Sequence, residues 1–311
     1  MKLASPPVTA GPDLNTGADP ADRAPRPQHE VADLAAFTAG PSRPSASPFI
    51  QADPILSVVV PAYRERDGIR ASLERLTGAL AATGMSWEVV VVVDGDAATM
   101  AAARLCQSDQ IRVVGYGQNR GKGFALRFGL AQTRGNVVSI IDADMEVAPE
   151  DIGRMVTLLH LYDADMVVGS KRHPLSQVSY PRLRRIQSST YQVLLRALFQ
   201  FNVRDTQTGL KVMRREVATR VVDVALVKRF AFDVELLALA RHFGFRRVME
   251  APVRIQYAFQ TTTSPGAVVR VLWDTAAIFY RLRIRHWYDR NATHGREALG
   301  VDLPEAVAVH R

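Results

Sequence analysis

The chain has 311 residues, of which 47% are apolar and 23% charged, so it is long enough for one large domain or two small ones with a buried core. Its single cysteine, Cys106, excludes an internal disulfide framework and is expected to be a small buried residue. No apolar run reaches the roughly 20 residues that span a bilayer, and the N terminus lacks the pattern of a secretory signal. These features predict a cytoplasmic protein, which can still lie on a membrane surface.

The formal net charge of +8 is unevenly distributed along the chain. Residues 51–170 contain 11 Lys/Arg and 15 Asp/Glu, whereas residues 171–229 contain 13 Lys/Arg and 3 Asp/Glu. This basic segment favours an anionic partner such as nucleic acid, anionic lipid or a phosphorylated acceptor. The alternative is a solvated basic surface. Because no nucleic-acid-binding motif accompanies the charge, we do not expect a nucleic-acid partner.

Residues 1–50 are rich in Pro, Ala, Gly, Ser and Asp without periodicity, which predicts a disordered tail. From residue 56 onward, apolar runs typical of buried strands alternate with segments in which apolar residues recur at helical spacing. This alternation predicts an α/β fold with a mostly parallel sheet flanked by helices. Strands are expected at 56–61, 88–93, 111–114, 136–141 and 165–169, and helices at 67–82, 97–105 and 123–132.

Longer helical patterns follow at 184–201, 231–242 and 268–288. The last of them interleaves arginines with Trp273, Phe279, Tyr280, Trp287 and Tyr288. Such interleaving suits the headgroup region of a membrane, although a helix packed on the domain with its arginines outward is the alternative. We expect residues 261–311 to form an amphipathic membrane-interface helix and a loose tail.

Two carboxylates, Asp142 and Asp144, directly follow the strand predicted at 136–141. The carboxyl ends of parallel strands are where α/β sheets bind ligands. Mg²⁺ and Mn²⁺ prefer oxygen ligands and often share them with substrate phosphates. The pair therefore suggests a divalent metal held against a diphosphate, with a helix cap or a solvated turn as the alternative.

Three further polar motifs follow predicted strands, and all four are expected to converge on one crevice. They are Pro61-Ala62-Tyr63-Arg64-Glu65, Asp94-Gly95-Asp96 and Asn119-Arg120-Gly121-Lys122-Gly123. In the last motif, Gly121 and Gly123 permit close backbone approach at a helix N terminus, where free N–H groups favour phosphate. Lys122 adds a positive charge for a diphosphate.

In the order and spacing of these motifs, over roughly residues 55–257, the chain resembles family 2 glycosyltransferases of the GT-A fold. Two later motifs make it similar to the polyprenyl-phosphate (dolichyl-phosphate) sugar synthases, and among them to the dolichyl-phosphate glucosyltransferase branch. These motifs are Asp205-Thr206-Gln207-Thr208-Gly209-Leu210-Lys211 and Arg229-Phe230-Ala231-Phe232-Asp233-Val234-Glu235. The resemblance implies a GT-A nucleotide-diphospho-sugar transferase domain at residues 51–260.

The resemblance also implies roles for the residues of the crevice. Asp142 and Asp144 are expected to bind Mg²⁺ or Mn²⁺, and Asp144 to take part in catalysis. Val93 departs from the family pattern, because the family usually has two adjacent aspartates before the glycine. The residues expected to bind the nucleotide sugar are Pro61, Ala62, Tyr63, Glu65, Asp94, Gly121, Lys122, Gly123 and Asp142.

On the acceptor side, Lys171 and Arg172 match the place where the family has its acceptor-phosphate arginine. Asp205 matches the family's catalytic acid near the acceptor. It is expected to orient the attacking phosphate, to balance an arginine, or to act as the base if the acceptor is a hydroxyl. Further candidates for the acceptor phosphate are Arg185, Gln207 and Lys211. Asp233 and Glu235 are expected to order the acceptor loop through pairs with Arg229.

The implied reaction is a metal-dependent displacement at the sugar C1 by a phosphate oxygen of a polyprenyl phosphate. A single displacement inverts the anomeric centre, and glucose from UDP-glucose is the favoured sugar. The protein is expected to work peripherally at the cytoplasmic face of a membrane, without a transmembrane helix. The alternatives are GDP-mannose as the donor, a soluble hydroxyl acceptor, or a nucleotide- or lipid-binding scaffold without catalysis.

Overall fold

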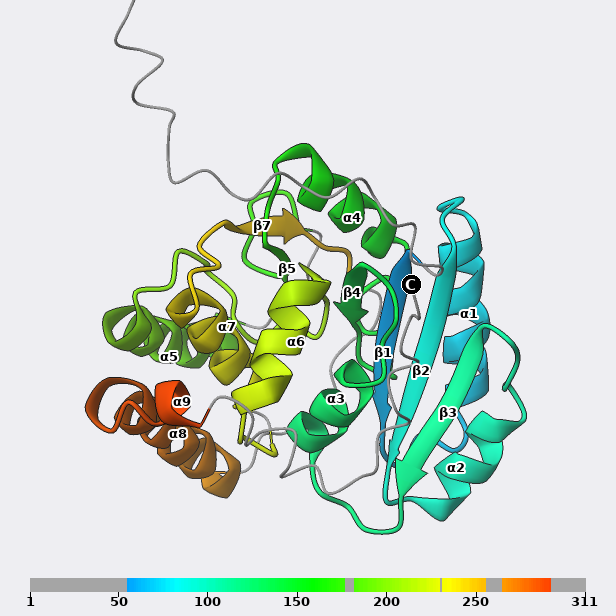
Figure 1. The fold of residues 1–311 in the computed structure, drawn as a ribbon, viewed down its shortest axis with the longest axis horizontal. Helices are drawn as coiled ribbons and strands as arrows, with labels where there is room; N and C mark the ends of the chain where they lie inside the picture. Colours follow the sequence, from blue (N-terminus) through cyan, green and yellow to red (C-terminus); the bar gives the residue numbers. More distant parts are fainter. Residues whose placement is uncertain (1–54, 177–181, 230, 256–264, 292–311) are drawn as a thin grey trace, which may run out of the picture. The chain divides into compact units, whose positions relative to one another are not determined.

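The structure is a computed structural model that describes residues 55–176, 182–229, 231–255 and 265–291, with the backbone alone for residues 182–190, 265, 267 and 268 (Figure 1). All of these residues belong to one compact unit, Ile50–Arg311. The tail predicted at residues 1–50 and the loose end predicted after residue 291 lie outside the described residues.

In the described part of the chain, seven strands form one sheet in the order β3-β2-β1-β4-β6-β5-β7. Neighbouring strands are parallel except at β6, which is antiparallel to both β4 and β5. The mostly parallel sheet predicted from the sequence is therefore confirmed. The strands are β1 (Leu56–Ala62), β2 (Trp87–Asp94), β3 (Ile111–Tyr116), β4 (Val137–Ile140), β5 (Met166–Ser170), β6 (Lys211–Arg214) and β7 (Val248–Pro252).

Strands β1 to β5 coincide with the five apolar runs of the sequence. In β2, Val89 to Val93 are buried on both faces of the sheet, and full burial of a valine contributes roughly 1.5–3 kcal/mol. The sequence does not predict β6 and β7, because both strands are short and contain charged residues in place of an apolar run.

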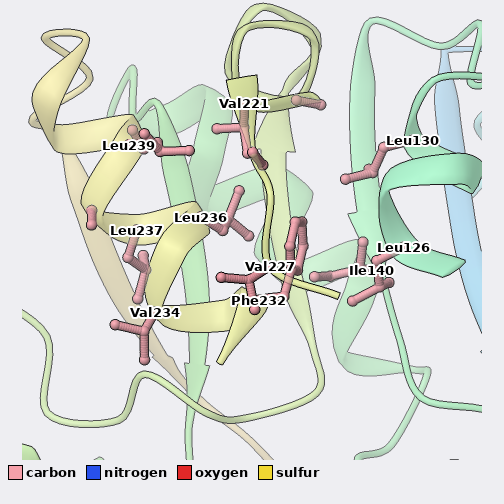
Figure 2. Close-up of a cluster of buried hydrophobic side chains, with 14 of the residues drawn as sticks. Leu126, Leu130, Ile140, Val221, Val227, Phe232, Val234, Leu236, Leu237 and Leu239 are labelled. Atoms are coloured by element: carbon pink, nitrogen blue, oxygen red, sulfur yellow. The ribbon is translucent and has the colours of Figure 1, made fainter. Parts of the chain in front are cut away.

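Helices cover both faces of the sheet (Figure 1). Since side chains alternate along a strand, Val58 and Val60 join a core with α1 and α4, while Val59 joins a second core with α3, α6 and α7. Figure 2 shows Leu126, Ile140 and Phe232 in the second core. The helices that precede the C-terminal segment are α1 (Ile69–Ala81), α2 (Ala97–Arg104), α3 (Lys122–Leu130), α4 (Asp151–Leu161), α5 (Arg182–Phe199), α6 (Arg215–Val224) and α7 (Phe232–His242). The sequence patterns do not predict α4 and α6.

The C-terminal segment differs from the single helix expected at 268–288. α8 (Pro265–Phe279) continues into a wider π-helical turn, η1 (Tyr280–Ile284), and the chain then bends at His286 into α9 (Trp287–Arg290). His286 has a left-handed φ of 48°. In a regular α-helix Leu282 and Tyr288 would point to different sides, whereas these irregularities bury both in the same core. Within the described residues, none of the helices combines the length and the hydropathy that crossing a membrane requires.

Candidate active site

The carboxyl edge of the sheet carries the polar motifs singled out in the sequence. β1, β2 and β4 end at Ala62, Asp94 and Ile140, and their loops begin at this edge. Because β6 runs antiparallel to β4, with Lys211 opposite Ile140, the loop that precedes β6 reaches the same edge. The antiparallel strand thus brings residues 205–210 beside the residues that follow β4.

Asp142 forms an ion pair with Lys122, whose Nζ lies 2.6 Å from the Asp142 Oδ1. Burial alone would raise the pKa of Asp142, but the positive charges of Lys122, Lys211 and Lys171 outweigh it and hold this pKa below its usual value. Burial alone would also lower the pKa of Lys122, but nearby carboxylates, Asp142 above all, raise it. Both side chains are therefore charged at neutral pH.

Glu65 and Asp144 add negative charge beside this ion pair. Asp144 is exposed, and its Oδ1 accepts a hydrogen bond of 3.1 Å from the N–H of Glu146. Burial raises the pKa of Glu65, and the negative charges of Asp144 and Asp142 raise it further. A bound cation would relieve this repulsion among the carboxylates.

The donor atoms of Asp142 and Asp144 suit a hard divalent cation. Among the residues that the structure describes, no group of three or more His, Cys, Asp or Glu side chains is placed to hold a metal. Mg²⁺ is usually bound by one or two carboxylates together with substrate phosphates and water. The two aspartates therefore fit a Mg²⁺ or Mn²⁺ ion that takes its other ligands from a diphosphate, and this role stays a prediction.

Asp94, at the end of β2, holds the turn that leads into α3. Its carboxylate is buried, with Oδ1 accepting from the N–H of Arg120 at 2.7 Å and Oδ2 from the N–H of Gly121 at 2.9 Å. Since both carboxylate oxygens accept from backbone N–H groups, this geometry favours support of the predicted nucleotide pocket over direct contact with the nucleotide. Val93, which precedes Asp94, is buried in the core below the site.

Gly121 and Gly123 allow a close contact between α3 and residues 226–229. Gly121 has a φ of +96°, and a Cβ there would lie 2.4 Å from the carbonyl oxygen of Lys228. A Cβ on Gly123 would lie 2.6 Å from the carbonyl oxygen of Val227. The two glycines therefore permit this close packing, and their predicted contact with a phosphate stays a prediction.

Three N–H groups at the N-terminal turn of α3 already have partners within the protein. The N–H groups of Arg120 and Gly121 donate to Asp94, and that of Phe124 donates to the Lys228 carbonyl at 3.1 Å. The positive charge that this turn offers a diphosphate therefore comes mainly from the Lys122 side chain.

The first motif lies partly in β1 and partly in the loop after it. β1 continues through Pro61, which is paired with Val92, to Ala62, so these two residues form the end of the strand. Tyr63 is exposed, and the Arg64 guanidinium lies 5.1 Å from the centre of its ring. Of this motif, Tyr63 has the exposed surface that a nucleotide base needs for stacking.

Asp205 fixes the loop that precedes β6. Its buried carboxylate accepts hydrogen bonds from the N–H of Lys171 at 3.0 Å, the Thr208 hydroxyl at 2.6 Å and the N–H of Gln207 at 3.2 Å. Its own N–H donates to Glu250 of β7 at 3.0 Å. These contacts favour a positioning role for Asp205 over that of a base, while the Gln207 side chain is exposed to solvent.

Lys171 and Arg172 follow β5 near this loop. Lys171 donates from Nζ to both carboxylate oxygens of Glu146, at 2.9 and 3.0 Å. Arg172 is partly buried beside it. The structure therefore places Lys171 between Glu146 and the Asp205 loop, which is compatible with the predicted acceptor role. The Arg185 side chain lies outside the described residues.

Lys211 does not take the position predicted for it. Its side chain is 0% exposed, and its Nζ donates to the Asp233 carboxylate and to the Thr208 carbonyl, both at 2.6 Å. Because a buried ammonium must have all of its partners inside the protein, this lysine stabilises the core beneath the site instead of meeting an acceptor phosphate. Asp233, for which the sequence suggested Arg229, thus has Lys211 as its partner.

Glu146 was not among the predicted site residues, and Glu235 has other partners than the Arg229 expected from the sequence. Glu146 pairs with Lys171, and its position two residues after Asp144 was an available signal. Glu235 is 0% exposed and accepts from the N–H groups of Leu226 and Val227 and from the Tyr288 hydroxyl. Nothing in the local sequence pattern indicates those partners, because Tyr288 is brought to Glu235 only by the tertiary fold.

Comparisons with known proteins agree with this arrangement. The model of the Glycosyl transferase family 2 matches residues 57–222. The chain is 33% identical over 207 residues to dolichyl-phosphate beta-glucosyltransferase of Homo sapiens, which covers 60% of this chain and 63% of the relative. It is 28% identical over 210 residues to the protein of the same name in Saccharomyces cerevisiae, covering 60% and 62%. The chain thus matches less than two thirds of the length of these relatives.

Solved structures share the fold at low sequence identity. Mannosyl-3-phosphoglycerate synthase from Rubrobacter xylanophilus has a TM-score of 0.58 and 17% identity, with 74% of each chain covered. Glucosyl-3-phosphoglycerate synthase from Mycobacterium tuberculosis, solved with Mn²⁺ and UDP-glucose, has a TM-score of 0.56 and 19% identity, with 82% of this chain and 83% of that chain covered. The predicted GT-A fold is therefore confirmed. The family match extends over more than half of the chain, so the chain belongs to glycosyl transferase family 2.

Proposed function

We propose that this protein transfers glucose from UDP-glucose to a polyprenyl (dolichyl) phosphate, with inversion at C1 and with Mg²⁺ or Mn²⁺. The observation that carries the proposal is the convergence of Asp142, Asp144 and Lys122 with the Asp205 loop at one edge of the sheet. Donor and acceptor phosphates would therefore meet beside the same carboxylates.

On the donor side, Asp142 and Asp144 would hold the metal ion, which when bound neutralises charge on the leaving nucleoside diphosphate. Lys122, already placed at 2.6 Å from Asp142, adds a second positive charge on the same side. Asp94 keeps the turn that carries Lys122 in place through two backbone hydrogen bonds. These residues position and stabilise the leaving group, and they need no proton transfer.

On the acceptor side, the attacking group is an ionised phosphate, which needs position and charge compensation more than a strong base. Lys171 is held by Glu146 and by its own N–H to Asp205, so its ammonium stays near the loop. Gln207 presents an exposed amide from that loop. Asp205 thus contributes by holding in place the loop that positions Lys171 and Gln207, and it does not contact the acceptor as a base.

The names of the relatives support the acceptor and the sugar. The human and yeast relatives are named dolichyl-phosphate beta-glucosyltransferases, and a beta product from an alpha-linked donor requires inversion. A solved structure of the same fold contains Mn²⁺ with UDP-glucose. GDP-mannose and a soluble hydroxyl acceptor are the alternative substrates.

An exposed apolar stripe on the C-terminal segment supports a membrane surface as a partner. Val269, Leu272, Trp273, Tyr280 and Ile284 follow one another at near-helical spacing and are all exposed, Trp273 to 76%. The opposite side of the same segment is buried. Exposed cations flank the stripe, namely Arg270, Arg283 and Arg285. Aromatic and aliphatic side chains beside arginines bind the interface of an anionic membrane, and we place the protein peripherally at the cytoplasmic face.

Replacing Trp273 and Leu272 together with alanine is expected to weaken vesicle binding about 10- to 100-fold, because the apolar surface that enters the membrane is lost. The measurement is sedimentation with vesicles of phosphatidylcholine and phosphatidylglycerol. Leu105→Ala is the control, since Leu105 is also an exposed apolar side chain but lies at the end of α2. Equal vesicle binding by the double variant and the wild type would show that this stripe does not bind the membrane.

Replacing Gly209 with alanine is expected to lower sugar transfer about 100-fold. A Cβ at this position would lie 2.2 Å from Oδ2 of Asp142, so it would push the carboxylate away from Lys122. Gly78→Ala serves as the control, because a Cβ there meets nothing within 4 Å. Steady-state kinetics of the two purified variants decide the matter, and an active Gly209→Ala would show that the Asp142 position is not critical.

The experiment that tests the function is a transfer assay with purified protein, a short polyprenyl phosphate and a panel of sugar nucleotides, with and without EDTA. We expect a lipid-linked product from UDP-glucose that requires Mg²⁺ or Mn²⁺. A product from GDP-mannose alone would show that GDP-mannose, and not UDP-glucose, is the donor. Transfer only to a soluble hydroxyl acceptor would show that polyprenyl phosphate is not the acceptor. The absence of any transfer would favour a binding scaffold without catalysis.

A further inference from the structure

Glu235 of α7 links two segments that are far apart in the sequence. Its carboxylate is fully buried and accepts from the N–H groups of Leu226, at 3.1 Å, and Val227, at 2.8 Å. It also accepts from the Tyr288 hydroxyl at 2.6 Å. A buried carboxylate needs such donors, and losing one leaves a carboxylate oxygen without a hydrogen-bond partner. The backbone at 226–227 and α9 therefore depend on the same carboxylate.

Residues 226–229 lie directly against the donor side of the candidate site. The Lys228 carbonyl accepts from the N–H of Phe124 at 3.1 Å, and it is in close contact with Gly121. The turn that they contact carries Lys122, which pairs with Asp142. A shift of residues 226–229 would therefore move the N terminus of α3 and its lysine.

Tyr288 belongs to the C-terminal segment that carries the exposed apolar stripe. It is fully buried, and burial, followed by the charge of Glu235, raises the pKa of its hydroxyl, so the hydroxyl keeps its proton and donates. α9 makes a second contact with α7, where His242 Nε2 lies 2.6 Å from the Asp289 carboxylate. This second contact does not involve Glu235.

We propose that Tyr288 and Glu235 are positioning residues that make the nucleotide-diphosphate site depend on the hydrogen bond from the Tyr288 hydroxyl of α9 to Glu235. Tyr288 holds Glu235 in place, Glu235 holds the backbone at 226–227, and this backbone holds the turn with Lys122. The inference deepens the proposed function and rests on it for the identity of the donor. The same contacts link the C-terminal segment, which carries the exposed apolar stripe, to the turn that carries Lys122.

The decisive comparison is Tyr288→Phe against Asp289→Ala in the full chain. The first removes only the hydroxyl that donates to Glu235, whereas the second removes the other tie of the same helix to α7. Calorimetric titration with UDP and Mn²⁺ should show about tenfold weaker binding by Tyr288→Phe and unchanged binding by Asp289→Ala. Wild-type affinity in Tyr288→Phe, or equal losses in both variants, would overturn the proposal.

Hydrogen–deuterium exchange tests the same chain of contacts without a ligand. Peptides that contain Leu226, Val227 and Phe124 should exchange about tenfold faster in Tyr288→Phe than in Asp289→Ala or the wild type. Unchanged exchange in these peptides would overturn the inference. Failure of the proposed function has a different signature, because the wild type would then not bind UDP while the order of exchange rates would persist.

A double variant separates positioning from a general loss of packing. In a Glu235→Gln background, which already weakens the contact to residues 226–227, adding Tyr288→Phe should change UDP affinity less than twofold, since the two residues act through one contact. Additive losses would contradict the proposed chain of contacts. If Glu235→Gln does not fold, the single Tyr288→Phe comparison still decides.

Discussion

Asp142→Asn is expected to reduce sugar transfer about 100- to 1,000-fold while the protein stays folded. The substitution removes the charge that Lys122 approaches to 2.6 Å and one of the two carboxylates expected to hold the metal. Charge on the leaving diphosphate would then be stabilised less at the moment of transfer. The measurement is kcat over a series of Mn²⁺ concentrations, with circular dichroism to verify the fold.

The position of Asp142 makes this expectation specific. Its Oδ2 is in close contact with Gly209 and its Oδ1 with Lys122, so it lies between the acceptor loop and the donor turn. Asp109→Asn is a suitable control, because Asp109 is an exposed carboxylate in the loop that leads into the amino end of β3. Full activity of Asp142→Asn at every Mn²⁺ concentration would exclude this carboxylate from metal binding.

The second large effect concerns stability, and Lys211→Met is expected to lower the free energy of unfolding by about 3–5 kcal/mol. The substitution leaves Asp233 buried without its counter-charge and the Thr208 carbonyl without its donor. Urea denaturation at neutral pH measures the change. Lys228→Met should stay within about 0.5 kcal/mol of the wild type, because the Lys228 side chain is exposed.

A double variant tests the assignment of the buried pair. Lys211→Met combined with Asp233→Leu should recover much of the lost stability, since removing both charges avoids an unpaired one. The original expectation for Lys211, contact with an acceptor phosphate, predicts a different result. In that case Lys211→Met would raise the KM for the acceptor and leave the unfolding free energy unchanged.

Much of the fold follows from local patterns in the sequence. The five apolar runs are long enough to specify buried parallel strands, and the motifs after them indicate which edge binds ligands. β6 is different, because Lys211 to Arg214 has charged ends and only two apolar residues. Its antiparallel insertion between β4 and β5 is what brings the Asp205 loop to the edge, and only the tertiary pairing reveals it.

Some site residues could likewise be identified from the local sequence, whereas the partners of others depend on the tertiary fold. Asp142 and Lys122 could be identified from their place after strands, and they do meet in the structure. The partners of Asp94 and Lys211 could not, because Asp94 accepts from an N–H 26 residues away and Lys211 pairs with a carboxylate 22 residues away. A sequence motif indicates that a residue matters at this site, but not whether it contacts the ligand or holds the residues that do.

The measurement that tests the central claim most directly is the anomeric configuration of the product formed from UDP-[¹³C]glucose and a polyprenyl phosphate. We expect nuclear magnetic resonance of the purified lipid to show glucose joined to phosphate as the β anomer, formed only with Mg²⁺ or Mn²⁺. An α-linked product would contradict a single displacement at C1. Glucose released into water, with no lipid-linked sugar, would contradict the assignment of the acceptor.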